Sequence, residues 1–282
     1  MPARPLACLP CRSALRLKST RSSPWQNDPR VRRRPVPDWL TRWEYAHRGL
    51  HGTGPDGTRV PENSLAGAKL AIEAGMGIEC DIQRSADDWP MVFHDWDLLR
   101  LTGQDGFTEG ATALALKELR YLDSEEGPAT MADLLDLVAG RVPLLIEIKS
   151  KRGYDVEASC AAVSNALREY AGDHAVMSFD PRVARWFRRK CPQTCAGLVM
   201  REDEHGYTQK RWQRRLAFAI AKPDFLAYHI AALPCAWVAS LRAGGLPVLT
   251  WTVNSPETRA RALLYADALI SEGLGLPETV AS

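Results

Sequence analysis

The sequence lacks several features that would have decided its class at once. No stretch approaches 18 consecutive apolar residues, which excludes a membrane-spanning helix from the expectations. No Gly-x-Gly-x-x-Gly follows the first strand-like segment and no Walker-type glycine loop is present, which argues against a dinucleotide site and nucleotide-driven phosphoryl transfer. The seven cysteines are odd in number and scattered, so a disulfide framework is not expected, and a reducing, cytoplasmic location fits better.

Charge is unevenly distributed along the chain. Residues 1–40 hold nine Lys and Arg and two Asp, a net of +7, so the other 242 residues are net −5 within a chain of +2. Because phosphate binding needs a basic face, nucleic acid is not expected as a partner of the acidic body. The Arg-, Pro- and Ser-rich residues 1–38 predict a basic, disordered extension before a domain at 39–282. A targeting segment, an interaction arm and a misassigned start codon are the alternatives.

Short apolar segments alternate with helical ones about eight times from Trp43 onward. Such alternation predicts a parallel sheet covered by helices. At this length the expected fold is a (β/α)₈ TIM barrel, with an open doubly wound sheet as the alternative. The strand-like segments are 44–46, 77–82, 91–93, 144–148, 175–179, 196–200, 225–230, 247–253 and 268–270.

Polar and aromatic side chains gather where these predicted strands end. Catalytic groups of a barrel collect at the carboxyl ends of its strands, so we expect residues far apart in the sequence to meet there. The residues in such positions are His47, Arg48, Glu79, Asp81, His94, Asp95, Glu147, Lys149, Trp251 and Asn254.

The carboxylates among them indicate a metal site. Glu79 and Asp81 are two apart on one strand, so both side chains point to the same face, and Glu147 repeats the arrangement on another. Three carboxylates at one barrel mouth repel one another, and a hard divalent cation such as Mg²⁺ or Ca²⁺ relieves that repulsion. The alternative is a salt-bridge network with Arg48 and Lys149 and no metal.

The remaining polar groups suit an anionic substrate. His47 and His94 lie beside the predicted carboxylates, and an imidazole titrates near neutral pH, so one can act as base while the other acts as acid. Arg48 and Lys149 suit a phosphate group. His51 is expected in a loop.

Six short motifs in order resemble the glycerophosphodiester phosphodiesterase family from Tyr45 to about Ile270. They are His47-Arg48-Gly49, Pro61-Glu62-Asn63-Ser64, Gly77-Ile78-Glu79-Cys80-Asp81-Ile82, Val92-Phe93-His94-Asp95, Leu145-Ile146-Glu147-Ile148-Lys149 and Thr250-Trp251-Thr252-Val253-Asn254. The resemblance implies a TIM barrel with a small insertion, roughly Asp87–Gly127, between its second and third units. It implies metal ligation by Glu79, Asp81 and Glu147, acid/base catalysis by His47 and His94, and substrate or phosphate contacts by Arg48, Glu62, Lys149 and Trp251.

The same resemblance implies a function. It is metal-dependent hydrolysis of small-molecule glycerophosphodiesters to sn-glycerol 3-phosphate and an alcohol. A lysophospholipase D or sphingomyelinase-D-like activity on lipids is the alternative, and a non-catalytic binding barrel is a third. The sequence departs from the family at Trp89, where a glycine often stands, and at Ser271-Glu272, where a Thr-Asp pair often stands. The oligomeric state stays open.

Overall fold

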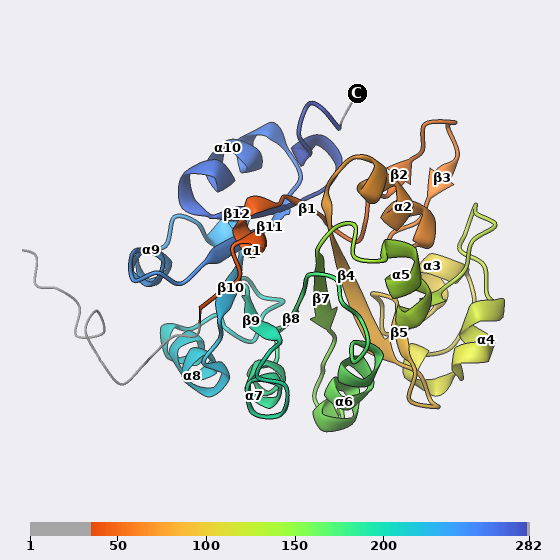
Figure 1. Cartoon of the computed structure of the whole chain (residues 1–282), viewed down its shortest axis with the longest axis horizontal. Coiled ribbons are helices and arrows are strands. Elements are labelled where there is room, and N and C mark those ends of the chain that lie inside the picture. The colour runs from red at the N-terminus through yellow and green to blue at the C-terminus, as the bar shows by residue number, and fades with distance from the viewer. Residues whose placement is uncertain (1–34, 281–282) are drawn as a thin grey trace, which may run out of the picture. The chain divides into compact units, whose positions relative to one another are not determined.

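The computed structural model describes residues 35–280, in which eight parallel strands close into a barrel surrounded by helices (Figure 1). The first strand closes the ring by pairing in parallel with both the last strand and the second. The predicted TIM barrel is confirmed, whereas all but four residues of the predicted 1–38 extension lie outside the described range. Round the ring the strands are β1 (Tyr45–Ala46), β4 (Gly77–Arg84), β7 (Leu144–Ile148), β8 (His174–Ser178), β9 (Cys195–Met200), β10 (Phe225–His229), β11 (Val248–Val253) and β12 (Ala268–Ser271).

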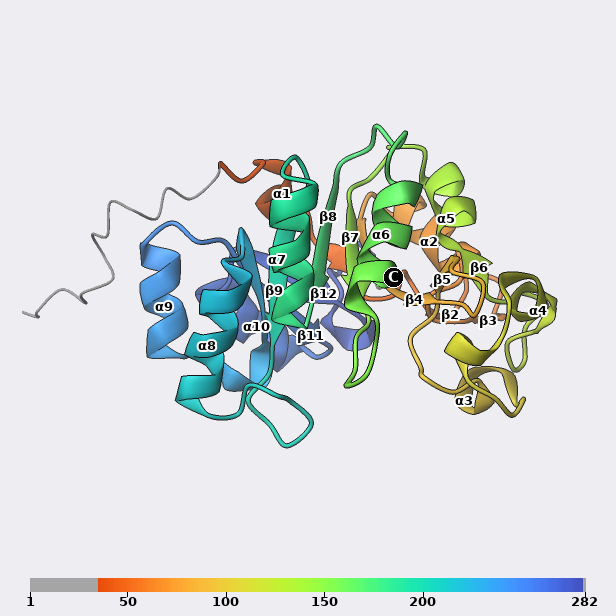
Figure 2. The same ribbon diagram turned by 90° about the horizontal axis from the view of Figure 1, so that it is seen from below.

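Seven of the helices within residues 35–280 each precede the next barrel strand along the chain and pack outside the ring. Figure 2 shows these helices from below. Side-chain oxygens of Ser64, Thr130, Asp155, Asp180 and Ser255 cap the first turns of five of them, which fixes where those helices begin. The helices are α2 (Leu65–Glu73), α5 (Met131–Val138), α6 (Val156–Ala166), α7 (Pro181–Lys190), α8 (Arg211–Ala221), α9 (Ala236–Ala243) and α10 (Pro256–Tyr265).

The core has two layers because strand side chains alternate between faces. Leu145, Phe225 and other residues fill the barrel interior, together with Leu40 of the short helix α1 (Trp39–Arg42). Cys80, Ile146 and residues of the same parity pack outward against the helices. The alternation leaves Glu79, Asp81 and Glu147 with the inward parity, as their spacing predicts.

The predicted insertion is present and lies between β4 and α5. It contains β5 (Pro90–Val92), α3 (Leu99–Thr102), a 3₁₀ turn η1 (Thr108–Gly110), α4 (Ala113–Glu118) and β6 (Ala129–Thr130). β5 runs antiparallel to β4, and the amide of Phe93 donates to the carbonyl of Asp81 at 3.0 Å. The strand predicted at 91–93 is therefore not a ninth barrel strand. It returns the chain from the tip of β4 to the level of Asp81.

Smaller elements complete the described chain. The loop after His47-Arg48-Gly49 forms a hairpin of β2 (Gly52–Thr53) and β3 (Arg59–Val60). Two 3₁₀ turns, η2 (Ile230–Ala232) and η3 (Gly273–Gly275), follow β10 and β12. No helix within residues 35–280 is long and apolar enough to cross a bilayer.

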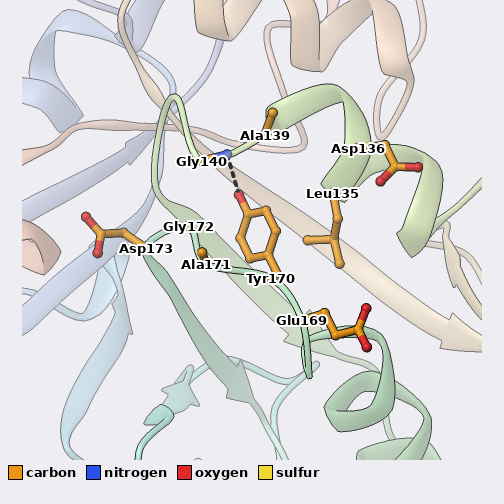
Figure 3. A pocket seen from close by; sticks show the side chains of 9 residues that line it. All are labelled: Leu135, Asp136, Ala139, Gly140, Glu169, Tyr170, Ala171, Gly172 and Asp173. Carbon is orange, nitrogen blue, oxygen red and sulfur yellow. Dashed lines mark hydrogen bonds between the residues drawn. The ribbon is translucent and has the colours of Figure 1, made fainter.

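A pocket of about 550 Å³ lies at the amino ends of β7 and β8, where α5 ends and the α6–β8 loop passes (Figure 3). The hydroxyl of Tyr170 accepts a hydrogen bond from the amide of Gly140 at 3.3 Å across it. Barrel chemistry gathers at the opposite, carboxyl ends of the strands. The candidate site is therefore sought there.

Candidate active site

Three buried carboxylates meet on the inward faces of the neighbouring strands β4 and β7. Glu79 and Asp81 of β4 are each 2% exposed and Glu147 of β7 is 7% exposed. Asp81 and Glu147 are register partners on neighbouring strands. One ligand oxygen from each of the three lies within 4.8 Å of the others. The structure thus brings together the three residues that the strand-end pattern selects as metal ligands.

Two cations lie against these carboxylates. Lys149 Nζ is 3.2 Å from Asp81 Oδ1 and 2.9 Å from Glu147 Oε1. Arg48 Nε is 3.4 Å from Asp81 Oδ2, and the Arg48 backbone amide donates to Glu79 Oε2 at 3.1 Å. Arg48 has a φ of 57° in the tight turn after β1, which directs its amide and its side chain to the same cluster. The charges of Arg48 and Lys149 offset two of the three carboxylates.

Asn63, named above only as a member of a motif, holds Asp81 in place. Its side-chain amide donates to Asp81 Oδ2 at 2.9 Å, and its side-chain oxygen accepts from the Asp81 backbone amide at 3.0 Å. Asn63 is 3% exposed and has a φ of 57°, a left-handed conformation that asparagine tolerates better than most residues. Its signal was its place in the Pro61-Glu62-Asn63-Ser64 motif.

Burial and neighbouring charges shift the pKa values of the clustered carboxylates in opposite directions. Burial, together with repulsion from Asp81 and Glu147, raises the pKa of Glu79 well above its ordinary value. Burial alone would raise the pKa of Asp81 as well, but Lys149, His94 and Arg48 outweigh it and lower that pKa. A site whose third carboxylate resists ionisation, and whose ligands are all oxygens, fits a hard divalent cation.

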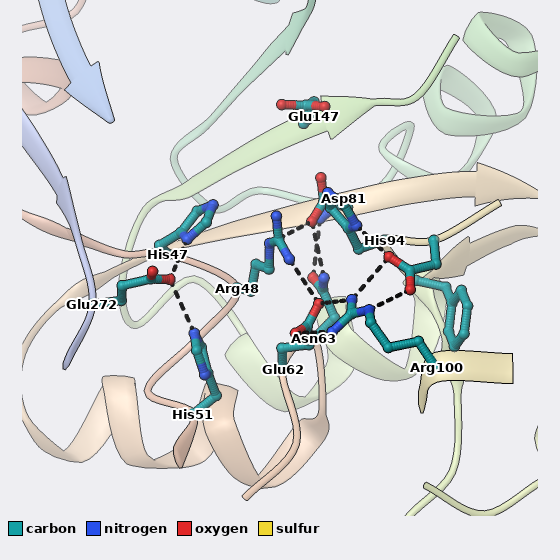
Figure 4. A network of polar contacts seen from close by, with 12 residues as sticks. His47, Arg48, His51, Glu62, Asn63, Asp81, His94, Arg100, Glu147 and Glu272 are labelled. Atoms are coloured by element: carbon teal, nitrogen blue, oxygen red, sulfur yellow. Dashed lines mark hydrogen bonds and ion pairs between the residues drawn. The ribbon is translucent and has the colours of Figure 1, made fainter. Parts of the chain in front are cut away.

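His47 lies between this cluster and the carboxylate of Glu272, which directly follows β12 (Figure 4). Its Nε2 is 4.0 Å from Glu79 Oε2, and its Nδ1 is 2.6 Å from Glu272 Oε2. His51, expected only to lie in a loop, places its Nε2 3.3 Å from the same Glu272 oxygen. Burial alone would raise the pKa of Glu272, but hydrogen bonds and charge from His47 and His51 outweigh this effect and hold that pKa below its ordinary value.

His94 has a carboxylate partner of its own. Its Nδ1 is 2.7 Å from Asp95 Oδ1, and Arg100 of α3 holds both oxygens of Asp95. The side-chain amide of Gln83, on β4, donates to the carbonyl of His94 at 3.0 Å. His94 therefore reaches the site because β5 turns back along β4, and not because a barrel strand ends there.

Glu62 joins the two halves of the network. It accepts from Arg48 at 2.7 Å, and from Arg100 at 2.9 and 2.8 Å. Burial would raise the pKa of Glu62, but these two guanidinium groups lower it to about 2. Glu62 thus fixes the side chain of Arg48, the predicted phosphate contact. Through Arg100 it also links the insertion to the loop that follows β1.

Trp251 lies apart from this network, over the ends of β8 and β10. Its indole N–H donates to the carbonyl of Ala227 at 3.1 Å. Its ring packs edge-on against Phe179, with centroids 5.4 Å apart, and tilts against His229 at 4.9 Å. The Arg201 guanidinium lies 5.6 Å from the ring centroid. Trp251 therefore forms an aromatic wall on the far side of the mouth, with no described contact to the carboxylates.

Residues 47–272 match the family model described as the glycerophosphoryl diester phosphodiesterase family. The chain belongs to this family. The match begins at His47 and ends at Glu272, the two residues that hydrogen bond across the closure of the barrel. The predicted family and the predicted enzyme class, a phosphoric diester hydrolase, are confirmed.

Individual relatives of the family agree. The chain is 28% identical over 252 residues to YhdW of Bacillus subtilis (strain 168), covering 81% of this chain and 96% of that protein. It is 26% identical over 249 residues to the glycerophosphodiester phosphodiesterase of Caldanaerobacter subterraneus subsp. tengcongensis, covering 83% and 94%. An Oleispira antarctica phosphodiesterase, solved in complex with the product sn-glycerol-3-phosphate, shares the fold with a TM-score of 0.70. Its sequence identity is 24%, with 81% of this chain and 92% of that one covered.

Proposed function

We propose that this chain hydrolyses glycerophosphodiesters to sn-glycerol 3-phosphate and an alcohol. The observation that carries the proposal is the cluster of Glu79, Asp81 and Glu147 flanked by two histidines, each with its Nδ1 against a carboxylate. The family membership supports the reaction class, and the Oleispira antarctica relative, with its bound product, supports the substrate class.

The chemistry follows from what each side chain can do. Glu272 and Asp95 accept hydrogen bonds from the Nδ1 atoms of His47 and His94, which leaves each Nε2 to take or give a proton. One histidine takes the proton of the attacking hydroxyl as the new P–O bond forms. The other protonates the alcohol oxygen as the old P–O bond breaks.

Arg48 and Lys149 would contact the phosphate oxygens, on which negative charge develops during the displacement. A divalent cation, Mg²⁺ or Ca²⁺, held by Glu79, Asp81 and Glu147, would supply further neutralisation of that charge when bound. The raised pKa of Glu79 supports this assignment, because burial and the neighbouring carboxylates of Asp81 and Glu147 disfavour its ionised form, which a bound cation would stabilise. Trp251 would pack against an apolar part of the glycerol or of the leaving group.

The test is release of glycerol 3-phosphate from glycerophosphocholine and glycerophosphoethanolamine, with Mg²⁺, with Ca²⁺ and with EDTA. We expect metal-dependent release that His47→Ala abolishes and that His205→Ala, an exposed histidine with no part in the site, leaves unchanged. A folded wild-type protein that releases nothing from either substrate, yet cleaves lysophosphatidylcholine, would instead establish the lipid-directed activity.

We also keep the cytoplasmic location as a proposal. It is supported by the buried thiols Cys80, Cys160 and Cys191, which form no disulfide. Cell fractionation with an antibody to the chain tests it, and recovery only outside the cytoplasm would contradict it.

A further inference from the structure

Helices α7 and α8, on the outside of the barrel, belong to the most basic stretch of the described chain. Residues 181–222 hold 11 Lys and Arg against three acidic residues, whereas the other residues from 41 to 282 are together net −13. Neither α7 nor α8 contains an acidic residue. The two helices pack side by side (Figure 2). The small net charge of the whole chain therefore conceals a strongly basic surface.

α7 presents arginines to solvent. Val183 and Phe187 are buried against the barrel, so at 100° per residue Arg185 and Arg189 lie on the opposite side of the helix, where both are exposed. Arg188, on the side towards α8, donates to the carbonyl of Lys222 at 3.1 Å and fixes the two helices together. Arg185 therefore lies next to the α8 side of the helix, and Arg189 lies further round on its solvent-exposed side.

α8 presents apolar side chains at its centre. Arg214, Ala217 and Ala221 are buried, so Trp212 and Leu216, four residues apart, point outward. Trp212 is 61% exposed and Leu216 is 52% exposed. Large apolar side chains exposed side by side on one helix turn mark an interaction surface better than scattered ones do.

A second pair of arginines lies on the other flank of this ridge. Arg211 and Arg215 of α8 are exposed on the same side of the helix as Phe218, whose ring packs edge-on against Trp237 of α9 at 5.7 Å. Within residues 35–280, no carboxylate makes an ion pair with any of the exposed arginines on the two flanks, which are Arg185, Arg189, Arg211 and Arg215. We call this surface the α7–α8 face; it comprises Arg185, Arg189, Arg211, Trp212, Arg215 and Leu216.

We propose that the α7–α8 face binds an anionic lipid surface. Anionic headgroups attract arginines on both flanks, and the interface accommodates a Trp and a Leu between them, as it does in amphipathic helices that lie on membranes. The long arginine stems can lie along the apolar ridge while their charges reach the headgroups. A phosphate backbone would use the arginines but leave Leu216 in water, which is why lipid fits better than nucleic acid. The proposal does not depend on the catalytic assignment.

The experiment is co-sedimentation of the full chain with phosphatidylcholine vesicles, with and without phosphatidylserine. We expect binding that requires phosphatidylserine and weakens with salt. Each cation near an anionic surface contributes about fivefold in affinity, so Arg185→Gln/Arg189→Gln should weaken binding by about 25-fold. Trp212→Ser should remove most of the binding that persists at about 1 M salt. The basic residues of 1–40 are present in every variant, so differences between variants report the α7–α8 face.

Matched controls come from α10, which also exposes a cation and apolar residues. Arg261→Gln and Leu264→Ser change exposed positions of that helix and should bind like the wild type. Thermal unfolding of every variant checks that it is folded. The proposal is overturned if the wild type ignores anionic vesicles, or if the α7 and Trp212 variants bind as tightly as the α10 controls. It is also overturned if the face retains single-stranded RNA and not vesicles.

Discussion

Glu272→Gln should slow the enzyme without unfolding it. Glu272 accepts from His47 Nδ1 at 2.6 Å, and the glutamate side chain is 27% exposed while that of His47 is 12% exposed. The glutamine keeps the shape but removes the carboxylate charge from the hydrogen bond that orients the His47 ring. A hydrogen bond to a charged group contributes about 1.5–3 kcal/mol, which corresponds to about 10- to 150-fold in rate when it is lost in the transition state.

The assay is steady-state release of glycerol 3-phosphate from glycerophosphocholine at saturating metal. We expect kcat to fall by that factor with KM nearly unchanged, because Glu272 touches His47 and His51 rather than the carboxylate cluster. Glu272→Asp should recover part of the loss. Glu257→Gln, an exposed change in the first turn of α10, is the control. A kcat within about twofold of the wild type for Glu272→Gln would refute the positioning role.

Three further predictions concern charge, metal and packing. The folded-state pKa of Glu62 is lowered to about 2, so the ionised Glu62 stabilises the fold above its unfolded pKa of 4.5, and this stabilisation is lost as pH falls towards 2. The free energy of urea unfolding should therefore be lower at pH 3 than at pH 5, by no more than about 3 kcal/mol from this group, and Glu62→Gln should remove this contribution to the pH dependence. Mg²⁺ or Ca²⁺ at about 100 times its Kd should raise the free energy of unfolding by about 2.7 kcal/mol, which is measured as a higher Tm. Glu79→Gln should lose most of this rise, and an equal rise in Tm for the wild type and Glu79→Gln would argue against the metal site. Gly197→Ala should destabilise the barrel by about 1–3 kcal/mol in denaturant unfolding, because a Cβ there would lie 2.3 Å from the Phe225 ring, whereas Gly110→Ala, with its nearest neighbour at 4.0 Å, should be close to neutral.

Much of the fold and part of the site could be predicted from local patterns. The alternation of apolar strands and helices predicts a parallel barrel because each strand must be buried on both faces. The i, i+2 spacing of Glu79 and Asp81 predicts that they share a face, which the outward packing of Cys80 confirms. These are consequences of strand geometry, which nearby residues determine.

What the sequence did not reveal depends on contacts between distant residues. Glu272 meets His47 only because β12 closes the barrel next to β1, a pairing across 225 positions. Arg100 reaches Asp95 and Glu62 from the insertion, whose path no periodic pattern describes. His94 lies at a strand end as predicted, but on an antiparallel strand that folds back on β4. Likewise, a net charge of −5 over the body gave no sign of the α7–α8 face.

The most direct test of the account is hydrolysis of glycerophosphocholine in ¹⁸O-labelled water, followed by ³¹P NMR, with His94→Ala and His205→Ala beside the wild type. The account predicts metal-dependent formation of glycerol 3-phosphate carrying the label on phosphorus, in the wild type and His205→Ala but not in His94→Ala. Label recovered in choline, or equal rates in the two histidine variants, would contradict phosphodiester hydrolysis at this site.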